Sequence, residues 1–227
     1  MFDSISWPVL GLVLLAFALL AVAVLFERRR ERHRLEQLTG WVATRAYTIE
    51  AAIRPVAEAG LAADLVSLPL FRRGRGQKVR NVIRGRTPDG TALLFDFRFT
   101  TQSGKQTATT EQTVAAFELP GPGLPWFRLS PEGFFQKIGQ ALGDPDIDFD
   151  SNPEFSRKYQ LRGSDPDAVR RLFEREAVTC LAGLDGWSAE GGGAWLIVFR
   201  HDHRPKPDDL TAFVDDARAI ARAITGR

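Results

Sequence analysis

Few residues in this chain have the types and spacing that catalysis or metal binding needs. His201 and His203 flank Asp202 and could offer two imidazoles to a metal, but a zinc site takes more ligands than two. The single cysteine, Cys180, lies in a segment predicted to be a helix. No Gly-x-Ser-x-Gly nucleophile motif occurs, and His33 lies in a cluster of arginines, where a general base would be poorly placed. A polar loop accounts for the histidine pair.

Gly104-Lys105 resembles the end of a phosphate-binding loop. That loop requires a glycine five residues before the Gly-Lys pair and a Ser or Thr directly after it. Phe99 and Gln106 occupy those two positions. The segment therefore predicts a hairpin turn.

Three acidic residues near position 148 alternate as in the first half of a calcium loop. The sixth and twelfth positions of such a loop should be glycine and glutamate. They are Ser151 and Arg157. We therefore predict no metal ligands, no cofactor and no catalytic residues from these motifs; the alternating acids are Asp146, Asp148 and Asp150.

The best candidate for a binding site is the basic segment between positions 72 and 86. Seven of its fifteen residues are Lys or Arg, and its glycines would let an anion approach the backbone. Anionic lipid, an acidic protein or nucleic acid could bind there, nucleic acid being the weakest because the chain lacks an extended basic groove. A solvated strand face would explain the same charges. The candidate anion-binding or partner-binding residues are Arg72, Arg73, Arg75, Lys78, Arg80, Arg84 and Arg86.

Positive charge is concentrated early in the chain. The net charge is +2, but residues 27–86 hold 14 Lys and Arg against 6 Asp and Glu, and residues 87–227 hold 16 against 21. Anionic headgroups attract such cations by about 1 kcal/mol each near a membrane surface. The alternative explanation is topological: a cluster of arginines directly after an apolar run can serve only to stop translocation. A single cysteine excludes an intrachain disulfide and a cysteine metal cluster.

The element that would position these charges is an uncharged run of 22 residues, 5–26. As a helix this run is roughly 33 Å long, and the hydrocarbon core of a bilayer is about 30 Å thick. A helix also pairs its own backbone polar groups, as lipid requires. The predicted partner of residues 5–26 is the lipid bilayer.

A signal peptide and a buried core helix are the alternatives to this anchor. Signal peptides carry their positive charges before the apolar run, whereas here Asp3 is the only charge before it. Arginines follow the run instead, and basic residues next to a span tend to stay in the cytoplasm. We therefore expect a single-pass protein of the bacterial inner (cell) membrane, with its N-terminus outside and its C-terminal domain in the cytoplasm. The predicted topology-setting residues are Arg28, Arg29, Arg30, Arg32 and Arg34.

The sequence predicts an α+β fold. In this fold an N-terminal transmembrane helix is followed by an antiparallel β-meander packed with helices. Residues 1–26 are the anchor, 27–64 a juxtamembrane helical connection and 65–227 the soluble domain. Within this domain, residues 65–130 form the meander. Its predicted strands are 65–71, 77–85, 91–101, 107–119 and 126–129. In the third of these, Phe95, Phe97 and Phe99 alternate with polar residues and share one buried face.

Residues 131–227 predict helices around a strand and a hairpin. Ser130-Pro131 has the residue types of a helix start, and the helix would end at Gly143. The following elements are predicted to be a strand at 155–162, a helix from Ser164-Asp165-Pro166 to Gly183, a hairpin of 187–190 with 195–199, and an amphipathic helix over 210–224. The run 195–199 is apolar on both faces and predicts a central strand.

Six short phrases of the soluble part carry a resemblance: PLF at 69–71, NVIRG at 81–85, FDFRF at 95–99, QTV at 112–114, PEG at 131–133 and FSRKY at 155–159. As a set they resemble an uncharacterised family of bacterial single-pass membrane-anchored proteins, over about 38–224 of this chain. The family carries no known reaction, cofactor or catalytic residue. The resemblance therefore implies one compact domain behind an anchor. Phe97 and Phe99 stand where similar sequences often have Tyr, which removes a hydroxyl at both positions.

These observations favour a membrane-tethered, non-catalytic interaction domain that binds a protein partner or anionic lipid at the cytoplasmic face. The alternative is a hydrolase or transferase whose catalytic groups come together from distant positions, which sequence patterns do not reveal.

Overall fold

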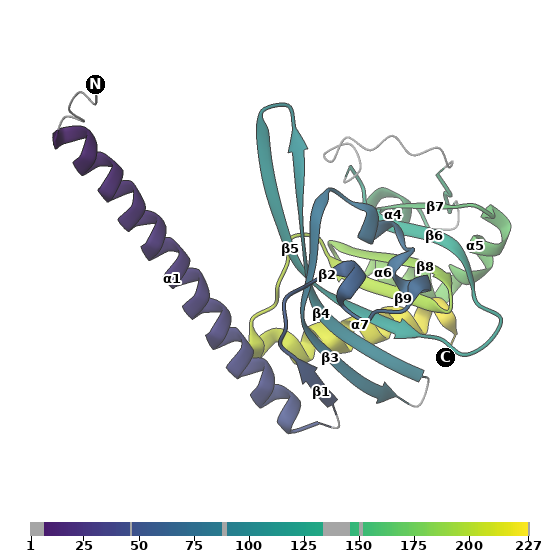
Figure 1. Ribbon diagram of the computed structural model, residues 1–227. Helices are drawn as coiled ribbons and strands as arrows, with labels where there is room; N and C mark the ends of the chain where they lie inside the picture. Colours follow the sequence, from purple (N-terminus) through teal and green to yellow (C-terminus); the bar gives the residue numbers. More distant parts are fainter. Residues whose placement is uncertain (1–6, 46, 88–89, 134–145, 150–151, 227) are drawn as a thin grey trace.

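The computed structural model describes residues 7–45, 47–87, 90–133, 146–149 and 152–226. A long helix, α1 (Trp7–Ala43), projects from a domain built on one antiparallel sheet (Figure 1). The predicted α+β fold, with an apolar N-terminal helix and a β-meander packed with helices, is confirmed.

The sheet has the strand order β1-β3-β4-β5-β9-β8-β6-β7, with β2 paired to β3. The strands are β1 Tyr47–Glu50, β2 Arg54–Pro55, β3 Arg75–Thr87, β4 Gly90–Ser103, β5 Gln106–Glu118, β6 Leu124–Pro131, β7 Tyr159–Gly163, β8 Trp187–Gly193 and β9 Trp195–Arg200. The other helices are α2 Ala63–Val66, α4 Pro153–Lys158, α5 Pro166–Leu172, α6 Arg175–Ala182 and α7 Leu210–Thr225, with 3₁₀ turns η1 Val56–Glu58, η2 Pro69–Arg72 and η3 Pro207–Asp209.

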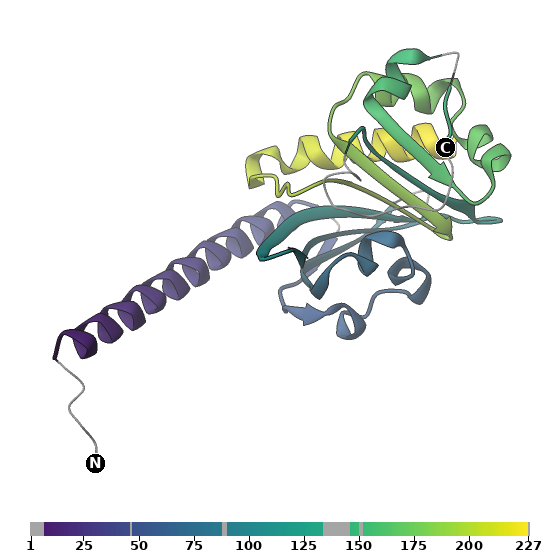
Figure 2. The same cartoon turned by 90° about the horizontal axis from the view of Figure 1, so that it is seen from above.

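The sheet separates two hydrophobic cores. In β4, Phe95, Phe97 and Phe99 pack on one face against the segment that contains α2 and η2. Leu94 lies in the core of the other face, which α7 and the end of α1 cover. Figure 2 shows α7 and the segment around α2 on opposite sides of the sheet. The predicted phenylalanine face is confirmed, but β4 is covered on both faces rather than on one.

The hairpin and the last helix are also where the sequence places them. The strand β9 lies between β5 and β8, as its two apolar faces predict. The three glycines between the two predicted hairpin strands, 191–193, belong to β8, although the sequence predicts the turn there. A Cβ at Gly191 would lie 2.2 Å from a ring carbon of Phe127, so the strand passes this ring only because the position has no side chain.

The strand predicted at 65–71 is wrong. Its residues form the end of α2 and the turn η2, and Pro69 could not donate to a strand ladder. Leu65, Leu68 and Leu70 are nevertheless fully buried, because these short helical turns lay them over the phenylalanine face.

Three further predictions change at their boundaries. The helical connection expected over 27–64 is helical to Ala43, after which β1 and β2 pair with β3. The strand expected at 155–162 begins as α4, because the side chain of Asn152 accepts a hydrogen bond from the Phe155 N–H at 3.0 Å and caps the helix. The helix predicted up to Gly183 is divided into α5 and α6 at Phe173.

Ser130 and Pro131 end strand β6 and do not start a helix. Most of the helix predicted there, residues 134–143, lies outside the described residues.

Candidate functional site at the foot of helix α1

Helix α1 has two parts with different environments. Among the described residues one helix, α1, is long and apolar enough to cross a membrane; its most apolar window has a mean hydropathy of 3.1 and none of it is buried. This exposure excludes the interpretation of the run as a buried core helix. The inner part of the same helix packs on the domain through Leu38 and Val42. The Trp41 indole N–H also donates to Thr211 Oγ1 at 3.0 Å.

An ion pair joins the inner part of α1 to the sheet. The Arg34 guanidinium donates to both carboxylate oxygens of Asp96 in β4, at 2.8 and 2.9 Å. It also donates to the Pro205 carbonyl at 2.8 Å. The side chain of Asp96 is 1% exposed. Bidentate geometry of this kind fixes the orientation of both groups as well as their charge.

Asp96 has further partners that satisfy its oxygens. Thr113 Oγ1 donates to Asp96 at 2.7 Å and the Asn81 amide donates at 3.0 Å. Asn81 has a φ of 53°, in a stretch where the register of β3 shifts against β4. Asn is one of the few residues that adopt this conformation readily, and the irregularity directs its amide to the carboxylate.

A second layer of charges surrounds this pair. Arg204 contacts Glu31 at 2.9 Å, Glu111 at 2.7 Å and Asp96 at 3.1 Å. Arg80 contacts Glu31 at 2.7 Å and Glu111 at 2.6 Å. With Arg34, three arginines and three carboxylates therefore form a connected group of balanced charge, and the exposed Arg98 contacts Glu111 at 3.5 Å from outside it. We call these six residues the charge network: Glu31, Arg34, Arg80, Asp96, Glu111 and Arg204.

The network favours the ionised forms of Glu31, Asp96 and Arg204. Burial acts to raise the pKa of Asp96, but the hydrogen bond from Arg34 and the charges of Arg204 and Arg34 outweigh it and hold this pKa well below its usual range. Burial likewise opposes the lowered pKa of Glu31, which results from Arg204 and Arg80. For Arg204, burial acts to lower the pKa, and Glu31, Asp96 and Glu111 together raise it. These groups carry their full charges near neutral pH.

A cleft of about 480 Å³ opens beside the network. Its walls are the first turns of α1 beyond the apolar run and the segment 202–207. Arg30, His33 and Lys206 lie at its exposed rim, together with the exposed acidic residues Glu27 and Asp202. Arg30 and His33 follow Phe26 by four and seven residues, which is about 6 and 10 Å along a helix. We call this feature the juxtamembrane cleft.

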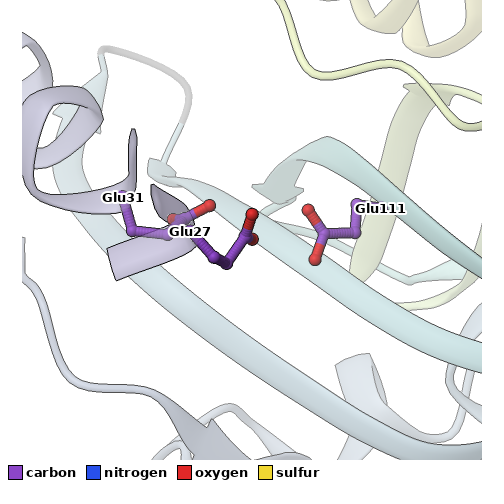
Figure 3. A group of neighbouring side chains, drawn as sticks. All are labelled: Glu27, Glu31 and Glu111. Atoms are coloured by element: carbon purple, nitrogen blue, oxygen red, sulfur yellow. The ribbon is translucent and has the colours of Figure 1, made fainter. Parts of the chain in front are cut away.

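Three carboxylates in the cleft are close enough to share a cation. Glu27 and Glu31 of α1 face Glu111 of β5 (Figure 3), and one oxygen of each lies within 4.8 Å of the others. Glu31 and Glu111 are, however, already paired with Arg80 and Arg204. Two guanidinium charges at the same oxygens oppose a bound cation, so we assign no metal to this group.

The basic segment predicted from the sequence is not one continuous surface. Arg73 and Arg80 are buried; Arg80 belongs to the charge network, and Arg73 pairs with the fully buried Glu190. The Leu70 N–H donates to the same carboxylate at 2.6 Å. Arg84 is half-buried and donates to the Gly60 carbonyl at 3.3 Å. The remaining members are exposed and spread along β3 and the turn before it, where binding stays a prediction: Arg72, Arg75, Lys78 and Arg86.

The predicted topology-setting arginines fall into two groups that differ in exposure. Arg28, Arg29, Arg30 and Arg32 are exposed on α1, whereas Arg34 turns into the domain. His201, Asp202 and His203 lie in the segment after β9, as the sequence predicts. Burial lowers the pKa of His203, with Arg200 acting in the same direction.

Comparisons with known proteins add a likeness of fold. No family model and no curated protein matches the chain. Among solved structures the chain is similar to the crystal structure of the mycobacterial trehalose monomycolate transport factor A, TtfA, with a TM-score of 0.57 and 14% sequence identity. The match covers 85% of this chain and 93% of TtfA. At this identity the likeness is one of fold.

Proposed function

We propose that this chain is a single-pass membrane protein whose non-catalytic domain binds anionic lipid headgroups in the juxtamembrane cleft. The observation that carries the proposal is the continuity of α1. One unbroken helix contains an exposed apolar stretch of membrane length and, a few turns later, the arginine that docks on Asp96. The cleft lies between these two points.

The charges beside the apolar stretch favour a cytoplasmic domain. The exposed arginines of α1 all follow the apolar run, and basic residues at that position tend to remain on the cytoplasmic side. In a bacterium with this orientation, the N-terminus is outside the inner membrane. The cleft then faces the anionic cytoplasmic leaflet.

The rim of the cleft has the chemistry that a phosphate headgroup needs. The charge network beneath it is internally balanced, so its arginines are already engaged. The exposed Arg30 and Lys206 are the cations of the rim, beside the exposed carboxylates of Glu27 and Asp202. Each such cation contributes about 1 kcal/mol of attraction to an anionic surface.

The likeness to TtfA supports a lipid-linked role. That protein is named as a trehalose monomycolate transport factor. The pKa directions in the network weigh against a general acid there, because a general acid needs a carboxyl whose pKa is raised toward neutrality. Those of Asp96 and Glu31 are lowered.

Photocrosslinking in nanodiscs tests this proposal. The full chain is reconstituted with a trace of phosphatidylglycerol that carries a photoreactive headgroup, or with the matching phosphatidylcholine. We expect the anionic probe to label peptides from 27–37 and 202–207, and Arg30→Gln with Lys206→Gln to reduce that labelling severalfold. Arg170→Gln, on the exposed surface of α5, is the control for loss of one cation.

Equal labelling by the neutral probe, or labelling unaffected by the double substitution, would contradict lipid recognition and leave a protein partner as the occupant of the cleft. Orientation is tested separately with C-terminal fusions. A fluorescent protein that matures only in the cytoplasm should be bright, and alkaline phosphatase at the same position should be inactive.

A further inference from the structure

The outer half of the β4–β5 hairpin extends beyond the rest of the sheet. Strand β3 pairs with β4 only as far as Thr100, and β9 pairs with β5 only from Val114 onward. Residues 101–109 therefore form a two-stranded ribbon held by its own ladder. Figure 1 shows it rising clear of the domain. We call these residues the hairpin tip.

Of the hairpin-tip side chains that the structure describes, none belongs to either hydrophobic core. Gln102 and Gly104 through Thr109 are exposed. Gly104 has a φ of 57°, as the first position of a type II′ turn requires. A two-stranded ribbon is marginally stable by itself and exposes unpaired backbone groups along its edges. A ribbon with this exposure and no core residues is suited to contact with something outside the domain.

Its composition matches the headgroup layer of a membrane. From Phe99 to Thr110 the chain has no acidic residue, and Lys105 at the turn is the only charge. The other residues of the hairpin tip are threonine, glutamine, serine, glycine and one alanine. Such side chains can donate to phosphate and ester oxygens, and a lysine stem can lie along apolar surface with its ammonium in the polar layer.

The ion pair between Arg34 and Asp96 fixes where the hairpin tip lies relative to the anchor. Phe26 precedes Arg34 by eight helical residues, or about 12 Å. Gly104 follows Asp96 by eight strand residues, or about 26 Å. The hairpin tip therefore reaches the level of Phe26 whenever the ribbon lies within about 60° of the helix axis. Figures 1 and 2 show the ribbon and the apolar part of α1 leaving the same side of the domain.

We propose that the hairpin tip lies in the headgroup layer of the membrane that α1 spans, and so gives the domain a second contact with the bilayer. Lys105 is the residue that contacts lipid phosphate. The inference rests on the proposed membrane anchor. It adds to that proposal a second surface, which begins 75 residues after the end of the apolar run and carries no apolar motif.

Depth-dependent fluorescence quenching tests the inference on the full chain. Cys180, the single cysteine, is replaced by serine, and one new cysteine is introduced for an environment-sensitive label at Gln106 in the hairpin tip. Asp167→Cys on α5 is the matched aqueous control, since its side chain is exposed and α5 lies on the far side of the domain from α1 (Figure 1). Leu19→Cys in the apolar part of α1 reports on the anchor. The vesicles contain phosphatidylcholine and phosphatidylglycerol with a nitroxide either at the headgroup or in the acyl chain.

We expect the headgroup nitroxide to reduce fluorescence at position 106 severalfold more than at position 167, and the acyl-chain nitroxide to quench position 19. Lys105→Glu should reduce the quenching at position 106. Equal quenching at 106 and 167, with position 19 quenched, would overturn the contact of the hairpin tip and leave the anchor intact. A label at position 19 that acyl-chain nitroxide does not quench would overturn the anchor itself, and the proposed function with it.

Discussion

Replacement of Arg34 by leucine should destabilise the domain far more than the same change at other arginines of α1. Removing one partner of a buried ion pair costs about 3–5 kcal/mol, because the remaining charge is left without compensation. Asp96 would keep Arg204 at 3.1 Å, together with the donors Asn81 and Thr113. The lower end of that range, about 3 kcal/mol, is therefore expected.

The measurement is denaturant unfolding of the full chain in neutral detergent micelles, followed by tryptophan fluorescence. Trp187 and Trp195 are both buried in the domain, so they report its unfolding. Arg32→Leu is the matched control, because that arginine lies on the same helix and is exposed. It should change the free energy of unfolding by no more than about 0.5 kcal/mol. For a domain of this size, Arg34→Leu should lower the melting temperature by about 10 °C.

A double-mutant cycle identifies the interaction. Arg34→Leu combined with Asp96→Asn removes the buried charge along with its partner, so the double variant should be more stable than the sum of the two single changes predicts. A free energy of unfolding for Arg34→Leu within 0.5 kcal/mol of the Arg32→Leu value, or strict additivity in the cycle, would refute the docking role of this ion pair.

Other predictions concern pH, the second buried ion pair and two glycines. Because the pKa of Asp96 is lowered on folding from the ordinary value of 3.8, its stabilising contribution is complete above that value and is lost as the pH falls below it; an acid titration of unfolding should be flatter for Asp96→Asn. Glu190→Gln leaves Arg73 as a buried charge and should cost about 3 kcal/mol in denaturant unfolding. The added Cβ of Gly40→Ala meets no atom within 4 Å, so this change should stabilise α1 by about 0.5–1 kcal/mol. Gly191→Ala should instead destabilise the domain by about 1–3 kcal/mol, because its Cβ would overlap the Phe127 ring. Thermal unfolding measures both changes. Equal effects at the two glycines would contradict the packing described for β8.

Local chemistry made part of this fold predictable. The helix α7 follows from its apolar spacing, and α5 begins where Asp165 accepts the Ala168 N–H at 3.0 Å. Asn152-Pro153 gave an equally usable start signal for α4, with a capping side chain and a proline at the first helical position. The prediction of a strand there missed that signal. The segment with Leu65, Leu68 and Leu70 could not be assigned from spacing, because single helical turns are too short to show a period.

The charge network was the harder part of the site to predict. Alternation in β4 shows that Asp96 shares a face with Leu94, but a period of two does not say whether another element covers that face. The covering residue, Arg34, lies 62 positions earlier and belongs to a run of arginines in which each member could equally well set topology. Leu94 was the available signal, since an apolar residue on the supposed solvent face indicates a second core.

Docking of α1 determines how much the rim of the cleft can contribute to lipid binding. A flexible linker would let the domain sample a large volume, and the effective concentration of headgroups at Arg30 and Lys206 would fall accordingly. Here Arg34 holds the same helix against Asp96 only four residues beyond Arg30, so no linker separates the anchor from the cleft. Attractions of about 1 kcal/mol for each cation then suffice to populate the bound state. We therefore expect Arg34→Leu to reduce lipid crosslinking although Arg30 and Lys206 are unchanged. Such a loss would show the contribution of helix docking separately from that of the rim charges.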